Sequence, residues 1–249
     1  MSAETAAPVS PPQPPVVVAV DGTSGSGKSS TCRAVAARLG LRYLDTGAMY
    51  RAVTLWMLQH NVDVHDAARV TALAGESGLE SGTDPEAPSI TLDGADVSAP
   101  IRSEQVNAAV SPVSAVPAVR ERLVALQRDL IGRAVTEAGG IVVEGRDIGS
   151  VVWPQAEVKV YLTADPAARA ARRSAENGID LTATQESLLA RDAIDSSRET
   201  APLTRVDGAI EIDSTHRTLD EVVDLIVELV EDRASAHPQA HAEAPVVSS

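Results

Sequence analysis

Short apolar runs alternate with amphipathic segments along most of the chain. The strand-like runs cover residues 16–20, 42–44, 141–144, 158–162 and 209–212. Segments with apolar residues at helical spacing follow or separate these runs, at residues 28–39, 48–59, 117–138, 166–176, 185–195 and 219–231. Short strands interleaved with helices are typical of a parallel sheet that is covered on both faces. The pattern therefore predicts an α/β fold with a five-stranded parallel sheet and helices on both faces.

Residues 75–100 interrupt this alternation. Within them, residues 89–92 and 95–97 have strand character and flank Asp93 and Gly94, a pair that favours a tight hairpin turn. We therefore expect a small subdomain inserted at about residues 75–100.

The two ends of the chain differ from the rest in composition. Residues 1–15 are rich in Pro, Ala and Ser, and residues 235–249 are similarly poor in periodic apolar positions. Such segments bury too little apolar surface to offset the entropy of ordering them. We expect two disordered tails, at 1–15 and 235–249, around one domain at residues 16–234.

The overall charge argues against a polyanionic partner. The chain carries 35 acidic and 21 basic side chains, a net charge of −14, whereas non-specific nucleic-acid binding needs a basic face. A lone cysteine, Cys32, excludes an internal disulfide and fits a reducing compartment. No apolar stretch approaches the roughly 20 residues of a membrane span, and residues 1–15 lack the basic residues of a signal peptide. We expect a cytoplasmic monomer that binds neither nucleic acid nor membrane and has no protein partner.

Residues 22–29 read GTSGSGKS and match the phosphate-binding pattern G-x-x-x-x-G-K-[ST] without a gap. An apolar strand precedes this loop and a helical segment follows it, which is the context that the motif requires. Backbone N–H groups and the helix N-terminus would surround phosphate oxygens, Lys28 would reach the β- and γ-phosphates, and Ser29 would bind Mg²⁺. The loop predicts a site for ATP and Mg²⁺ formed by Gly22, Thr23, Ser24, Gly25, Ser26, Gly27, Lys28, Ser29 and Ser30.

Phosphorylation of an acceptor needs a second anion pocket, and Arg is the side chain best suited to bidentate phosphate contacts. Three clusters lie after strands or on helices, at residues 45–51, 144–147 and 191–198. Arg146 and Asp147 follow a strand beside the nucleotide site, and we assign them a function because ligands bind at the carboxyl ends of parallel strands. For Arg191, Asp195 and Arg198, a surface salt-bridge network fits the spacing equally well.

A switch GTPase shares this loop but needs a base-reading N-K-x-D segment, and neither Lys28 nor Lys159 lies in one. A binding module without catalysis would not need the arginine clusters. These residues favour an enzyme.

The motifs together resemble the bacterial cytidylate kinases, which are P-loop nucleoside monophosphate kinases. The resemblance extends from Val16 to about Arg233. It includes residues 21–28 (DGTSGSGK), 45–51 (DTGAMYR), 101–106 (IRSEQV) and 144–149 (EGRDIG), and it continues through residues 191–198, 201–203 and 213–215. Two departures from the family pattern are Thr23 in place of Pro and Thr46 in place of Ser.

The resemblance implies a role for each matching residue. Arg51, Arg146 and Arg198 would hold the acceptor phosphate, and Asp195 and Arg191 would meet the ribose. The cytosine edge would be read by Asp147, Arg120 and Ser111, with Thr46 close by. The groups expected to act in transfer of the γ-phosphoryl group of ATP to CMP or dCMP are Lys28, Arg146, Arg191 and Arg198.

The resemblance also implies a P-loop NTPase fold with two additions. The insert at about residues 75–100 would be a small nucleotide-monophosphate-binding subdomain, and residues 169–199 would form a helical lid. Arg172 and Arg173 fit either that lid or a solvated helix face. Two alternatives stay open: another small P-loop kinase, acting on UMP, AMP or shikimate, and a non-catalytic ATP-binding regulator.

Overall fold

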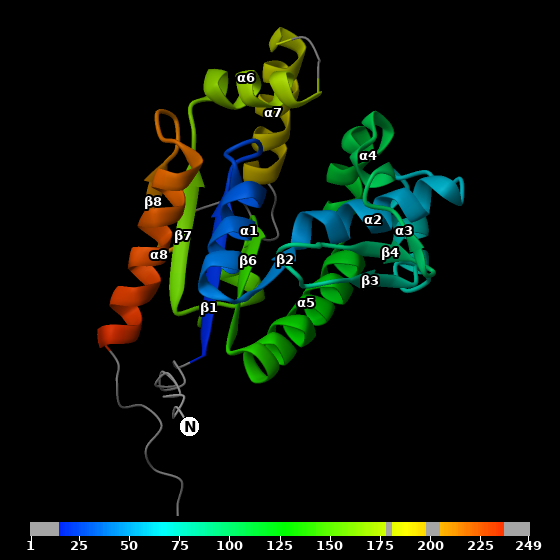
Figure 1. Ribbon diagram of the computed structural model, residues 1–249. Helices are drawn as coiled ribbons and strands as arrows, with labels where there is room; N and C mark the ends of the chain where they lie inside the picture. The colour runs from blue at the N-terminus through cyan, green and yellow to red at the C-terminus, as the bar shows by residue number, and fades with distance from the viewer. Residues whose placement is uncertain (1–14, 178–180, 198–204, 237–249) are drawn as a thin grey trace, which may run out of the picture.

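The computed structural model describes residues 15–177, 181–197 and 205–236. A five-stranded sheet lies at its centre, in the strand order β2-β6-β1-β7-β8 (Figure 1). Each neighbouring pair of strands is parallel, which confirms the predicted sheet. The strands are β1 (Val16–Gly22), β2 (Arg42–Asp45), β6 (Gly140–Gly145), β7 (Val158–Thr163) and β8 (Ile210–Asp213).

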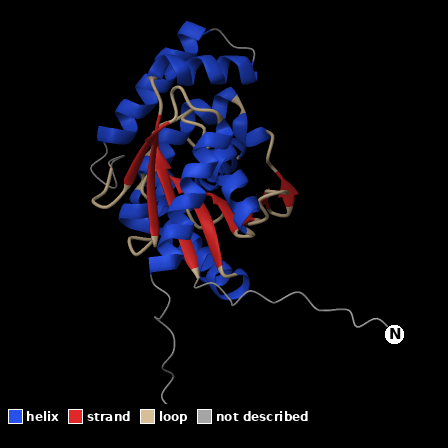
Figure 2. Cartoon of the chain, turned by 60° about the vertical axis from the view of Figure 1, so that its left-hand side comes forward, coloured by secondary structure: helices blue, strands red, loops and turns tan. Residues whose placement is uncertain are grey.

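Helices cover both faces of this sheet (Figures 1 and 2). Alternate residues of β1 enter two separate apolar clusters, since successive side chains of a strand point to opposite faces. Val18 and Val20 pack with α1 (Lys28–Leu39) and α8 (Leu219–Ala236). Val17 and Ala19 belong to the cluster with α2 (Thr46–Gln59) and α5 (Pro117–Ala138). The continuous apolar run in β1 thus builds the cores of both faces.

Two glycines end helices at the positions that the sequence predicts. Gly40 follows α1 with φ 66°, and Gly139 follows α5 with φ 72°. These left-handed conformations favour glycine, which has no Cβ to clash with the backbone. Each glycine therefore turns the chain directly into the next strand, β2 or β6.

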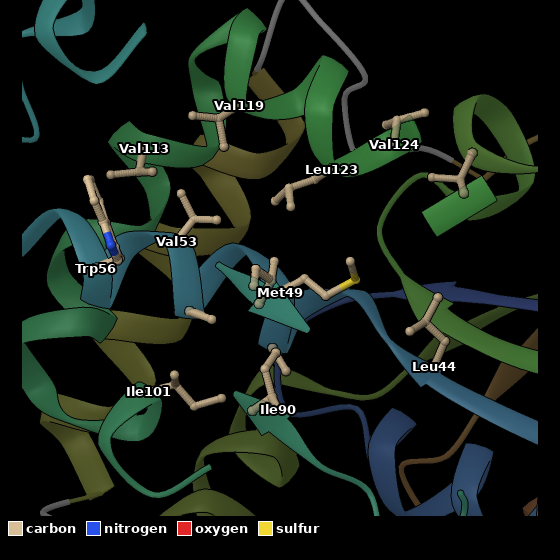
Figure 3. Packing of buried hydrophobic residues seen from close by; sticks show 14 of the residues in the cluster. Leu44, Met49, Val53, Trp56, Ile90, Ile101, Val113, Val119, Leu123 and Val124 are labelled. Carbon is tan, nitrogen blue, oxygen red and sulfur yellow. The ribbon is translucent and has the colours of Figure 1, made fainter. Parts of the chain in front are cut away.

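The inserted subdomain contains the predicted hairpin, with β4 (Ile90–Leu92) and β5 (Ala95–Asp96) around a turn at Asp93 and Gly94. Both turn residues have positive φ, 50° and 80°, as a two-residue hairpin turn requires. A third strand that we did not predict, β3 (Leu79–Ser81), pairs antiparallel with β4. Figure 3 shows Ile90 of this sheet close to Met49, and both side chains belong to the α2–α5 cluster. The insert is therefore tied to the main domain by a shared core.

Two further helices were missed in the sequence, α3 (Ala67–Leu73) and α4 (Glu104–Ala115). The α4 helix contains Pro112, a residue that removes a helical hydrogen bond and is unfavourable inside a helix. Ser103 offsets part of this cost because its hydroxyl accepts from the Val106 N–H at the start of the helix.

Beyond the carboxyl ends of the strands lie α6 (Pro166–Asn177) and α7 (Leu181–Ser197) (Figure 1). The α7 helix begins four residues earlier than the segment at 185–195 that we expected. Among the described residues, no helix combines the length and the apolar composition that crossing a membrane requires.

Candidate nucleotide-binding site

A cavity of about 570 Å³ opens at the carboxyl ends of β1, β2 and β6. This is the edge at which open parallel sheets bind ligands. The phosphate-binding loop forms one wall, and side chains from α2, α5 and β6 form the other. The predicted site residues that line the cavity are Ser24, Gly25, Gly27, Lys28, Ser29, Ser30, Thr46, Arg51, Arg120, Arg146 and Asp147.

The phosphate-binding loop connects β1 directly to α1, as the motif requires. A Cβ at Gly22 would lie 2.0 Å from the Leu162 carbonyl oxygen, so the loop can leave the sheet there only with glycine. Gly27 caps α1 with φ 89°, another left-handed conformation. The Lys28 ammonium donates to the carbonyls of Gly22 and Thr23, at 2.9 and 2.7 Å. The loop thus places a positive charge and a helix N-terminus on the same side of the cavity.

Glu144, at the end of β6, is a buried carboxylate in the cavity wall beside the loop. Its partners are the Tyr43 hydroxyl, which donates at 2.6 Å, and the Ser29 hydroxyl. Burial raises the pKa of Glu144, the charge of Asp45 raises it further, and Lys28 opposes both. We predicted Glu144 only as a member of the cluster at residues 144–147 and gave it no role of its own, although it pairs in register with Val20, just before the loop. A carboxylate that ends the strand beside a phosphate loop was the signal for it.

The donor set around Glu144 fits Mg²⁺. Carboxylate and hydroxyl oxygens from Ser29, Asp45 and Glu144 are the hard ligands that Mg²⁺ prefers, and the ion usually completes its shell with water and phosphate oxygens. Within the described residues, no group of three or more His, Cys, Asp or Glu side chains could hold a metal by itself. The arrangement therefore suits an ion that is carried in with a nucleotide.

An ion pair between Arg120 and Asp147 forms part of the wall opposite the loop. The side chains are only 7% and 8% exposed, and the Arg120 guanidinium lies 5.7 Å above the Tyr50 ring. Nearby, the Thr46 hydroxyl donates to the Glu144 carbonyl at 2.7 Å. The structure thus brings together three of the four residues predicted to read a base.

The fourth, Ser111, is buried on α4, and its carbonyl accepts from the Ser114 hydroxyl at 3.1 Å. Ser114 and Val110 of the same helix line the cavity, and Ser111 is not among the lining residues. Its assignment to the base stays a prediction.

Two of the arginines predicted to hold the acceptor phosphate reach this cavity. Arg146 donates to the Gly22 carbonyl, which ties the end of β6 to the phosphate loop. Arg51 donates to the Asn107 side-chain oxygen at 2.7 Å and to the Ile101 carbonyl at 3.0 Å. Ile101, which belongs to the motif at residues 101–106 quoted above only for its resemblance, and Asn107, which follows that motif, therefore orient an arginine of the site.

Asp21 fixes the turn that carries Arg146 and Asp147, and it was not predicted. Its two carboxylate oxygens accept from the N–H groups of Ile148 and Gly149, each at 2.8 Å. Burial raises its pKa to about 6, although these two hydrogen bonds oppose the rise. The last residue of β1 before the loop thus holds the start of the π-helical turn at Ile148–Val152.

The residues expected to form a lid are placed less completely. Arg172 lines the cavity and donates to the carbonyl and the hydroxyl of Ser214, so it is not part of a solvated helix face. The side chains of Arg173, Arg191 and Asp195 lie outside the described part of the structure, as does all of Arg198. Their predicted roles are untested.

Comparison with known proteins identifies the family of this chain. The family model for "Cytidylate kinase" matches residues 18–232. The chain is 55% identical over 224 residues to a cytidylate kinase of Streptomyces avermitilis, with 90% of this chain and 96% of that protein covered. A cytidylate kinase of Streptomyces griseus is 55% identical over 222 residues, covering 89% and 95%, and one of Streptomyces coelicolor is 53% identical over 224 residues, covering 90% and 96%. This chain, with its phosphate loop facing a buried Arg–Asp wall, belongs to the cytidylate kinase family.

Proposed function

We propose that this protein transfers the γ-phosphoryl group of Mg·ATP to CMP or dCMP, giving CDP or dCDP. The observation that carries the proposal is the single cavity in which a phosphate-binding loop faces Arg51, Arg146 and the Arg120–Asp147 pair. The name of the relatives, cytidylate kinase, supports the same reaction. A non-catalytic ATP-binding regulator would have no use for the second wall.

On the donor side, the loop from Gly22 to Ser30 would bind the ATP phosphates through its N–H groups and through Lys28. Ser29 and Glu144 would hold Mg²⁺, which would neutralise charge on the β- and γ-phosphates when bound. The positive N-terminus of α1 adds to this field.

On the acceptor side, Arg51 and Arg146 would hold the phosphate of CMP, together with Arg198. Asp147 would accept from the cytosine amino group, and Arg120 would donate to the ring nitrogen or the carbonyl; Ser111 and Thr46 would complete this base contact. Uracil has a carbonyl in place of the amino group, so it would leave Asp147 facing another acceptor. A site built on such hydrogen bonds discriminates strongly, because the wrong base leaves buried polar groups unpaired.

The reaction itself is an in-line displacement. An oxygen of the CMP phosphate forms a bond to the γ-phosphorus, and the bond from that phosphorus to the β–γ bridging oxygen breaks, so that ADP leaves. The acceptor oxygen is already anionic, and no side chain has to remove a proton. Catalysis then comes from alignment and charge neutralisation, by Lys28, Arg146, Arg191 and Arg198.

The test is ADP formation from Mg·ATP with CMP, dCMP, UMP, AMP or shikimate offered separately. Fast turnover with CMP and dCMP, and much slower turnover with UMP, would support both the reaction and the base contacts. Turnover with AMP or shikimate alone would retain a P-loop kinase and remove the cytosine assignment. No turnover with any acceptor, but tight binding of Mg·ATP, would favour the regulator.

A further inference from the structure

A second buried ion pair lies on the opposite side of the phosphate loop. A guanidinium nitrogen of Arg169 on α6 lies 2.5 Å from a carboxylate oxygen of Asp192 on α7, and the two side chains are 4% and 14% exposed. Neither residue lines the cavity. Neither residue carries a role predicted from the sequence, and the pair lies beyond the donor and acceptor contacts described above.

Both members of this pair bind the backbone of one loop residue, Ser24. The Asp192 carboxylate accepts from the Ser24 N–H at 3.2 Å, and the Arg169 guanidinium donates to the Ser24 carbonyl at 2.9 Å. Arg169 also donates to the Ala164 carbonyl just after β7, at 3.1 Å. The pair therefore joins the end of β7, both lid helices and the phosphate loop through one guanidinium.

The space beside Gly25 is closed by the same two helices. A Cβ at Gly25 would lie 3.4 Å from the Arg169 Cβ and 3.7 Å from a methyl group of Leu188. Leu188 is buried one turn before Asp192 on α7. The two helices thus pack directly on the loop, and Figure 1 shows α7 approaching it from beyond the sheet.

We propose that Arg169 and Asp192 are positioning residues that hold α7 in register with the donor phosphates, an inference that rests on the proposed function. Arg191, expected to act on the transferring phosphoryl group, directly precedes Asp192 in the chain. The contact from Asp192 to Ser24 therefore fixes the backbone of Arg191 relative to the loop that binds ATP. Catalysis by alignment is sensitive to such placement, since a shift of about 1 Å can cost on the order of a hundredfold in rate.

The first variant is Asp192→Asn, which keeps the shape of the side chain and removes its charge. We expect kcat with CMP to fall about tenfold or more, because alignment in the transition state is lost. The Kd for Mg·ATP without acceptor should change by less than about threefold, since Lys28 and the other loop N–H groups remain. A purely structural role would instead lower the thermal midpoint and leave kcat per folded molecule unchanged.

Two more variants test whether the two residues act as a unit. They are Arg169→Lys and the double variant that combines Arg169→Lys with Asp192→Asn. Lysine keeps the charge but cannot reach Ala164, Ser24 and Asp192 together. The loss in the double variant should be clearly smaller than the product of the two single losses, as expected for contacting residues. Losses that multiply independently would overturn the proposal.

Asp224→Asn is the matched control. It removes an Arg38–Asp224 pair of the same 2.5 Å separation, which joins α1 to α8 and is 53% and 52% exposed. We expect kcat, KM and Mg·ATP affinity to stay at wild-type values, because exposed pairs contribute little.

Amide hydrogen exchange provides a readout that needs no acceptor. Exchange at residues 23–27 should become faster in Asp192→Asn and stay unchanged in Asp224→Asn. A wild-type kcat in Asp192→Asn would overturn the positioning role whatever the exchange rate, as would a loss confined to the KM for ATP. If the wild-type protein fails to phosphorylate CMP, the proposed function fails by itself, and loop exchange still decides whether the pair holds the loop.

Discussion

Two buried Arg–Asp pairs flank the phosphate-binding loop, and their surroundings differ. Arg120 and Asp147 both line the cavity, and the ring of Tyr50 lies beneath the guanidinium. Arg169 and Asp192 lie outside the cavity lining, and their hydrogen bonds go to each other and to backbone groups of the loop and the β7 end. The chemistry is the same in both pairs, but one faces a space for a ligand and the other faces the chain.

This difference indicates that the first pair is suited to recognise a ligand and the second to position parts of the chain. A buried ion pair is a weak source of stability by itself, because desolvation of two charges offsets most of their attraction. Groups that line a cavity can exchange a contact for one with a ligand, and a ligand that cannot offer it is rejected. Groups that bind backbone atoms of the same chain do not exchange these contacts for contacts with a ligand. They hold the loop and the helices in fixed positions instead.

The largest expected effect comes from removing Lys28, on the phosphate loop that lies between the pairs. Lys28→Ala should lower kcat/KM with CMP by about 10³-fold to 10⁴-fold, because the ammonium that neutralises the transferring phosphoryl group is lost. Steady-state ADP formation measures this. Turnover near the wild-type value would show that the loop takes no part in phosphoryl transfer. The two pairs could then no longer be compared by their effects on that reaction.

The next effect separates the pairs directly. Asp147→Ala should lower the ratio of kcat/KM for CMP to that for UMP by about 10³-fold, because the carboxylate that accepts from the cytosine amino group is gone. Asp192→Asn is the matched variant on the other side, and it should slow both acceptors equally and leave the ratio unchanged. An unchanged ratio in Asp147→Ala would refute base reading. A changed ratio in Asp192→Asn would remove the distinction between the pairs.

The sequence predicts the fold well where the pattern is local. Apolar runs and glycine stops define β1, β2, β6 and α1, because the periodicity and the left-handed C-caps lie within a few residues of each element. Helix α4 has no such local pattern, because Pro112 is unfavourable inside a helix. The core that holds this helix comes from segments distant in the sequence. Strand β3 is three residues long and is defined by its pairing with β4, eleven residues further on.

The candidate site likewise has parts that a local pattern predicts and parts that depend on contacts between distant segments. The phosphate loop is contiguous and could be identified from its motif, and Asp147 could be assigned to the site from its place at a strand end. The role of Asp147 in reading the base, and any role for Arg120, came only through the family resemblance. Asp21 and the pair of Arg169 with Asp192 were not found, because their partners lie 23 or more positions away. A single Asp or Arg on a helix or strand end carries no local pattern that separates such a long-range contact from a surface salt bridge.

The smallest expected effect concerns Asp21, which lies beneath the turn that carries Asp147. Burial raises its pKa to about 6, well above the ordinary value of an aspartate, and the nearby charge of Asp147 adds to the rise. The folded state therefore binds a proton that the unfolded state has already released between about pH 4 and pH 6. The free energy of unfolding should decrease over this interval as pH rises, by roughly 3 kcal/mol at most from this group.

Asp21→Asn should remove this pH dependence. The variant also loses an acceptor for one of the two N–H groups, a cost of about 1–3 kcal/mol that does not depend on pH. The free energy of unfolding of wild type minus that of the variant should thus be largest near pH 4 and fall by up to about 3 kcal/mol by pH 7, to zero or below, which urea unfolding at pH 4, 5, 6 and 7 measures. Glu144 is present in both proteins, so its own titration cancels in that difference. Parallel pH profiles would contradict the raised pKa and would show that the hydrogen bonds from Ile148 and Gly149 offset the burial of Asp21 in full.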